Sequence, residues 1–120
     1  MTRRIVLIED DPAIGVLVDD TLTDAGHAAD VRSGLPDGAV DRDTRLVITD
    51  LVALRGYDVG AARAWIARVR RAFPEAAVIV STAHQRAGID GAAGLGADAV
   101  LTKPFDVNEF ARTVQSLLGT

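Results

Sequence analysis

The stretch Ile5–Asp11 reads IVLIEDD, and it decides the fold class because four consecutive apolar residues end abruptly in three acids. Three further apolar runs, at Leu46–Thr49, Ala77–Ser81 and Val100–Leu101, also lead directly into polar side chains. Uninterrupted apolar runs of this length are typical of strands that helices cover on both faces of a parallel sheet. His27–Val31 is a weaker candidate for a fifth strand.

Helical periodicity occupies the segments between these strands. It is found in Pro12–Ala25, Val59–Phe73, Arg86–Leu95 and Val107–Leu118. Asp11 is the expected N-cap of the first of these helices, because its side chain can accept hydrogen bonds from free N–H groups at the helix start. Alternation of strand and helix predicts an α/β fold with a parallel sheet.

The composition excludes several classes of function. The 120 residues fit one domain, which is expected to cover residues 1–120. A net charge of −4 gives no general attraction to nucleic acid or to an anionic membrane. The chain has no cysteine, so disulfides and thiol nucleophiles are excluded. No signal peptide or membrane span is recognisable, and a cytoplasmic location is expected.

Two segments are poor helix formers. Ser33–Thr44 contains two glycines and a proline, so any second helix there is expected to be short. Arg86–Leu95 contains three glycines, and each costs roughly 0.5–1 kcal/mol relative to alanine within a helix. This helix is expected to be the least stable in the chain.

Polar side chains stand at the carboxyl ends of four predicted strands. They include Glu9, Asp10, Asp50, Thr82 and Lys103. In an open parallel sheet the carboxyl ends meet at one edge, where ligands bind. Clustered carboxylates repel one another, and a hard cation such as Mg²⁺ relieves that repulsion. A carboxylate beside such a cation can attack phosphorus, while an ammonium and a hydroxyl hold phosphoryl oxygens.

Four sequence segments carry a family resemblance. They read IVLIEDDP (5–12), LVITDL (46–51), VIVSTA (78–83) and GADAVLTKPF (96–105). In this order, the chain resembles the receiver domain of bacterial two-component response regulators, which has the fold of the chemotaxis response regulator. The resemblance covers the whole chain. It implies a single doubly wound, flavodoxin-like sheet of five parallel strands in order 2-1-3-4-5, flanked by five helices.

The resemblance also implies a role for each polar residue. Asp50 is the expected phosphoacceptor, Thr82 the switch hydroxyl, and Lys103 the lysine that pairs with the phosphoryl group. The expected Mg²⁺ ligands are Glu9, Asp10, Asp50 and the backbone carbonyl of Val52. Such a domain is a signalling module that catalyses its own phosphorylation rather than an enzyme acting on other substrates.

The implied partners are proteins. The phosphoryl donor would be a histidine kinase or a histidine phosphotransfer protein, and the phosphorylated domain would act on a downstream effector protein. No direct contact of this domain with nucleic acid or membrane is expected. The position of the first strand near Met1 and of the last helix near Thr120 favours a stand-alone receiver or the N-terminal receiver of a larger regulator.

The chain departs from the family pattern at two positions. Leu54 stands where the family usually has a proline after the phosphoacceptor, and Val100 stands where it usually has an aromatic residue. These departures keep open a pseudo-receiver, a protein-interaction scaffold that is not phosphorylated. A metal-dependent phosphatase with an aspartate nucleophile is a third alternative. It usually needs an Asp-x-Asp pair after its first strand, where Glu9 and Asp11 would have to serve.

Overall fold

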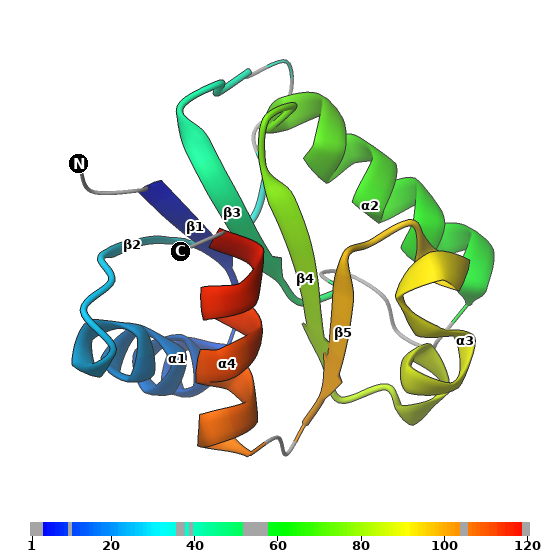
Figure 1. The fold of residues 1–120 in the computed structure, drawn as a ribbon. Coiled ribbons are helices and arrows are strands. Elements are labelled where there is room, and N and C mark those ends of the chain that lie inside the picture. Colours follow the sequence, from blue (N-terminus) through cyan, green and yellow to red (C-terminus); the bar gives the residue numbers. More distant parts are fainter. Residues whose placement is uncertain are drawn as a thin grey trace.

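In the computed structural model, residues 4–9, 11–35, 38, 40–51, 58–103 and 106–118 are described. Five parallel strands form one sheet (Figure 1). They are β1 (Arg4–Ile8), β2 (Ala29–Arg32), β3 (Thr44–Thr49), β4 (Ala77–Thr82) and β5 (Ala99–Thr102). Their spatial order is β2-β1-β3-β4-β5, which confirms the predicted sheet. From β1 the chain continues to β2 on one side and then crosses to β3 on the other side of β1. The strand order therefore reverses at β1 and β3, and the carboxyl ends of these two strands flank the expected binding crevice.

Four helices are present in the described part of the chain. They are α1 (Pro12–Asp24), α2 (Val59–Ala72), α3 (Gln85–Leu95) and α4 (Val107–Leu118). Helices α1 and α4 cover one face of the sheet, and α2 and α3 cover the other (Figure 1). The expectation of five helices is wrong here, because no described residue between β2 and β3 is helical. The two glycines and one proline of that segment account for the missing helix, and Gly38 has a φ of 74°.

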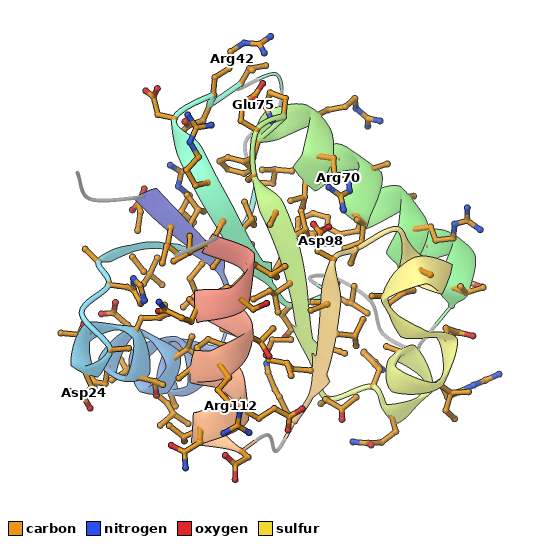
Figure 2. All side chains as sticks on the ribbon, in the orientation of Figure 1. Asp24, Arg42, Arg70, Glu75, Asp98 and Arg112 are labelled. Carbon is orange, nitrogen blue, oxygen red and sulfur yellow. The ribbon has the colours of Figure 1, made fainter. Side chains whose placement is uncertain are left out.

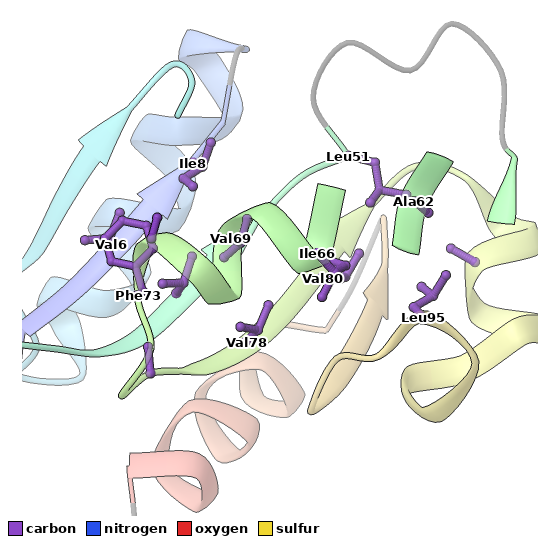
Figure 3. Close-up of a cluster of buried hydrophobic side chains, with 14 residues drawn as sticks. Val6, Ile8, Leu51, Ala62, Ile66, Val69, Phe73, Val78, Val80 and Leu95 are labelled. Atoms are coloured by element: carbon purple, nitrogen blue, oxygen red, sulfur yellow. The ribbon is translucent and has the colours of Figure 1, made fainter. Parts of the chain in front are cut away.

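Alternation along the strands divides the buried side chains between two cores. Figure 3 shows the core under α2 and α3, where Val6, Val78 and Val80 of the sheet meet Ile66 and Val69 of α2. The second core lies under α1 and α4 and takes the alternate strand residues. It includes Ile5, Leu7, Ile48, Ile79, Leu22 and Phe110. Because both faces are buried, the strands read as continuous apolar runs.

Aspartates begin three of the helices. The side chain of Asp11 accepts hydrogen bonds from the backbone N–H groups of the second and third residues of α1, as predicted. Asp58 caps α2 in the same way, and the Asp106 side chain accepts from the N–H groups of Asn108 and Glu109 in α4. These caps fix where the helices leave the edge of the sheet that carries the polar strand ends.

Helix α3 is interrupted at one of its glycines. Gly91 has φ 73° and ψ 173°, which is outside the helical region. Only glycine adopts this conformation without strain. Helix α3 therefore consists of two short pieces that meet at Gly91.

An ion pair ties α2 to the turn before β5. Figure 2 shows Arg70 and Asp98 facing each other, and Arg70 Nη2 lies 3.2 Å from Asp98 Oδ2. Arg70 Nε also donates to the Gly96 carbonyl at 2.8 Å, and Asp98 Oδ2 accepts from Val78 N at 2.8 Å. Since Asp98 binds β4 as well as α2, this contact fixes the start of β5 and hence the position of Lys103 at its far end.

Candidate active site

Asp50 directly follows β3, the middle strand of the sheet. Its backbone N–H donates to the Ile8 carbonyl at 2.9 Å, which extends the pairing of β1 and β3 by one residue. Its Oδ1 accepts a hydrogen bond from Leu51 N at 2.7 Å. The side chain is 20% exposed, so one carboxylate oxygen is held by the main chain while the group still reaches solvent.

Lys103 joins two carboxylates that come from different strands. Its Nζ lies 2.7 Å from Glu9 Oε2 and 3.3 Å from Asp50 Oδ2. Glu9 follows β1, Asp50 follows β3 and Lys103 follows β5. The structure therefore brings together three of the polar residues expected to meet at this edge. Because β4 lies between β3 and β5, the lysine side chain must extend along the edge to reach both acids.

Glu9 is the most buried member of this group, with a side chain only 2% exposed. Burial raises the pKa of its carboxyl above the ordinary value, and the negative charge of Asp50 acts in the same direction. Hydrogen bonds from Lys103 and from the backbone N–H of Asp11 oppose the increase in pKa but do not cancel it. Glu9 thus holds a charge that is costly to bury, and a nearby cation lowers that cost.

Thr82, the last residue of β4, is fully buried. Its backbone carbonyl accepts from Lys103 N at 2.7 Å, so it lies beside the base of the lysine. Its hydroxyl accepts a hydrogen bond from His84 N at 3.2 Å, just before α3. In this state, therefore, the Thr82 hydroxyl bonds to the start of α3 rather than to Asp50.

The donors that are described suit a hard cation. Glu9 and Asp50 supply carboxylate oxygens, and Mg²⁺ is commonly held by one or two carboxylates together with waters. The expected ligands Asp10 and the Val52 carbonyl lie outside the described residues, as does Leu54. Among the residues that the structure describes, no cluster of three or more acidic or histidine side chains forms a complete metal site.

Val100 occupies the position where the resemblance anticipates an aromatic residue. It lies on β5 and packs against the core under α2 and α3. A branched aliphatic side chain in this place has no polar tip and no ring to rotate between buried and exposed positions.

Two residues at the site were not identified from sequence. Trp65 of α2 donates from Nε1 to Thr49 Oγ1 at 2.9 Å, and Thr49 Oγ1 donates to the Asp50 carbonyl at 2.7 Å. The sequence favours a packing or partial-surface role for Trp65 over a role as a ligand. A usable signal was the threonine that interrupts an apolar strand directly before the key aspartate, since a buried hydroxyl needs partners.

The described helices include none that is long and apolar enough to span a membrane. No protein-family model matches the chain. Among curated proteins, the chain is 37% identical to the transcriptional activator protein IrlR of Burkholderia pseudomallei, over 96% of this chain and 50% of IrlR. The chain therefore spans about half the length of this relative.

Solved structures show the same fold along their whole length. A response regulator receiver protein from Burkholderia phymatum is 27% identical, with a TM-score of 0.71 over 98% of this chain and 96% of that one. A CheY-like receiver domain protein from Methanospirillum hungatei gives a TM-score of 0.73 at 17% identity, over 98% of this chain and 94% of that one. These comparisons place the chain among the receiver domains of response regulators.

Proposed function

We propose that this response regulator receiver domain accepts a phosphoryl group on Asp50 and thereby switches its binding to a downstream effector protein. The carrying observation is the lysine ammonium that lies 2.7 Å and 3.3 Å from two carboxylates of neighbouring strands. This arrangement stands at the carboxyl edge of a doubly wound sheet, beside the reversal between β1 and β3, where such folds bind ligands.

The chemical step is a transfer from a phosphohistidine of a histidine kinase or histidine phosphotransfer protein. A carboxylate oxygen of Asp50 attacks phosphorus, the new P–O bond forms, and the P–N bond to the imidazole breaks. The leaving imidazole keeps the electron pair of that bond and takes a proton from its surroundings. The product is an aspartyl phosphate, a mixed anhydride with enough stored energy to change the conformation of the domain.

Lys103 is the residue that stabilises the negative charge of the phosphoryl group during this transfer. Its ammonium already faces Asp50 Oδ2, so it can hold a phosphoryl oxygen with little movement. Positioning and electrostatic stabilisation are most of what phosphoryl transfer needs from a protein. Leu51 N–H holds Asp50 Oδ1 and so limits the rotation of the carboxylate about its own bond.

Glu9 and Asp50, with Asp10 and the Val52 carbonyl, are the proposed ligands of Mg²⁺. When bound, the cation would neutralise charge on the transferring phosphoryl group. The buried carboxylate of Glu9 is the described group most in need of such a cation, since burial raises its pKa. Without metal, Lys103 is the positive side chain that contacts both carboxylates in the described part of the chain.

Thr82 is the proposed switch. If its hydroxyl turns toward a phosphoryl group on Asp50, it gives up the hydrogen bond from His84 N at the start of α3. The glycine break at Gly91 makes α3 easy to rearrange. We therefore place the surface that changes on phosphorylation at α3, in a domain where Val100 replaces the usual aromatic switch residue.

Intact-mass measurement with acetyl phosphate and Mg²⁺ tests this function. We expect a single phosphoryl adduct that EDTA abolishes, that Asp50→Asn lacks, and that the matched surface control Asp20→Asn retains. Absence of an adduct, together with absence of Mg²⁺ binding, would instead support the pseudo-receiver, a scaffold that binds its partners without phosphorylation. Turnover of phosphomonoesters by the domain would support the phosphatase alternative.

A further inference from the structure

A chain of hydrogen bonds runs from helix α2 to the main chain of Asp50. Trp65 Nε1 lies 2.9 Å from Thr49 Oγ1, and Thr49 Oγ1 lies 2.7 Å from the Asp50 carbonyl oxygen. An indole N–H can only donate and a carbonyl oxygen can only accept. The direction of the chain is therefore fixed, because the single hydroxyl proton of Thr49 must point at the Asp50 carbonyl.

This chain of hydrogen bonds is linked to the Asp50 carboxylate through one peptide group. The carbonyl of Asp50 and the N–H of Leu51 belong to the same planar unit, so holding the oxygen also fixes the direction of the N–H. That N–H donates to Asp50 Oδ1 at 2.7 Å. The hydroxyl of Thr49 thus sets, through the peptide plane, the position of one carboxylate oxygen of Asp50.

The two oxygens of Asp50 consequently have different surroundings. Oδ1 is held by the main chain, whereas Oδ2 lies 3.3 Å from Lys103 Nζ. A carboxylate held in one rotamer presents the same oxygen to an incoming phosphorus at each encounter. Such positioning raises the rate of phosphoryl transfer, because a carboxylate that is not held must first be oriented before it can react.

The outer end of the chain is also fixed. Trp65 is partly buried against the core under α2 and α3, and the guanidinium carbon of Arg68 lies 5.3 Å from the centroid of its ring. Thr49 is fully buried at the end of β3 and follows the buried apolar residues Leu46, Val47 and Ile48. A valine would fill that space without the cost of burying a hydroxyl, and the two hydrogen bonds of Thr49 offset that cost.

We propose that Thr49 and Trp65 are positioning residues for phosphoryl transfer to Asp50, acting through the Asp50–Leu51 peptide group. This inference rests on the proposed function for its kinetic consequence, but its structural consequence stands apart from phosphorylation. The hydrogen bond between Leu51 N–H and Asp50 Oδ1 would then depend on Thr49 at the end of β3 and on Trp65 in α2.

Three substitutions isolate the hydrogen bonds from the packing. Thr49→Val removes the hydroxyl at nearly constant volume, and Trp65→Phe removes the indole N–H while keeping an aromatic ring. Thr49→Ser restores the hydroxyl and serves as the rescue variant. Thr113→Val is the matched control, because the Thr113 hydroxyl also donates to a carbonyl, that of Glu109 at 2.9 Å, on the opposite side of the sheet.

The first readout is the NMR signal of the Leu51 amide in the unphosphorylated domain with EDTA. In the wild type this amide should exchange slowly with solvent, because its N–H donates to Asp50 Oδ1. Thr49→Val and Trp65→Phe should increase its exchange rate, Thr49→Ser should restore the slow exchange, and Thr113→Val should leave it unchanged. Thermal unfolding of each variant shows whether the domain remains folded.

The second readout is the phosphorylation rate with acetyl phosphate and Mg²⁺. Thr49→Val should lower it by about fivefold to tenfold, the kinetic equivalent of one lost hydrogen bond. A Leu51 amide that is unaffected in folded Thr49→Val and Trp65→Phe would overturn the proposal, as would wild-type rates in both. If the wild type takes no phosphoryl group, the proposed function fails. The exchange rate of the Leu51 amide then decides by itself whether Trp65 and Thr49 position Asp50.

Discussion

Replacing Lys103 by methionine should destabilise the metal-free domain and make it unusually responsive to divalent cations. The substitution keeps the length of the side chain but removes the ammonium that contacts both Glu9 and Asp50. Both acids lie within reach of that ammonium, at 2.7 Å and 3.3 Å, so each loses its nearest positive charge among the described residues.

The magnitude follows from the geometry. At an effective dielectric constant of about 20, attraction across 2.7 Å is worth about 6 kcal/mol and across 3.3 Å about 5 kcal/mol. Most of this is offset by the cost of desolvating Lys103, whose side chain is only 12% exposed. Removing one partner from a fully buried ion pair costs about 3–5 kcal/mol, so this partly open site should lose about 1–3 kcal/mol. For a domain of this size, about 2 kcal/mol lowers Tm by roughly 6–12 °C.

A double-mutant cycle provides the assay. Urea unfolding at pH 7 with EDTA would compare the wild type, Lys103→Met, Glu9→Gln and the double variant. In the Glu9→Gln background Lys103 keeps Asp50 as its acidic partner but no longer contacts an acid at position 9, so Lys103→Met should cost much less there. Added Mg²⁺ should recover most of the stability lost by the single Lys103→Met variant. Equal costs of Lys103→Met in the two backgrounds, or stability unaffected by Mg²⁺, would refute the reasoning.

Three further predictions follow from single contacts. Glu9→Gln should stabilise the metal-free domain at pH 7, because the pKa of Glu9 is raised in the folded state and ionised Glu9 therefore opposes folding. In unfolding experiments at decreasing pH, the stability advantage of the variant over the wild type should shrink as the pH falls through that pKa. Gly91→Ala should cost about 1 kcal/mol by placing a side chain at φ 73°, which urea unfolding measures against Gly94→Ala as the control. Trp65 is the single tryptophan, so Thr49→Val should shift its fluorescence emission, whereas Thr113→Val should not.

The sequence predicts the arrangement of the sheet and the meeting of its polar strand ends. Parallel strands place their carboxyl ends on one edge whatever the detailed packing, so Glu9, Asp50 and Lys103 could be expected to lie close together before any coordinates were known. The structure places them there. Their roles in phosphoryl transfer remain predictions until phosphorylation is measured.

Other features depend on packing that sequence patterns do not encode. The contact between Trp65 and Thr49 requires a particular orientation of α2 about its axis, which depends on how α2 packs against the core beneath it. The hydroxyl of Thr82 accepts a hydrogen bond from the His84 N–H, and this partner depends on where α3 begins. Composition indicated that α3 is weak, but only coordinates locate the break at Gly91.

The missing second helix has a simpler origin. The family resemblance implies five helices, one of them between β2 and β3, whereas the composition of that segment indicates that any helix there is short. Its glycines and proline oppose helical backbone angles, and the local sequence prevails over the family pattern in the described residues. The strand order was also implied by the family resemblance, and there the structure agrees with it. Hydrophobic burial on both faces explains only why the strands are continuous apolar runs.

Identification of the phosphorylated residue tests the central claim most directly. After phosphorylation with acetyl phosphate and Mg²⁺, borohydride reduction converts an aspartyl phosphate into homoserine, which peptide mass spectrometry can locate. The account predicts homoserine at position 50 and nowhere else in the chain, with none in the Asp50→Asn variant. Homoserine at another aspartate, or a reduced peptide map identical to that of the untreated protein, would contradict it.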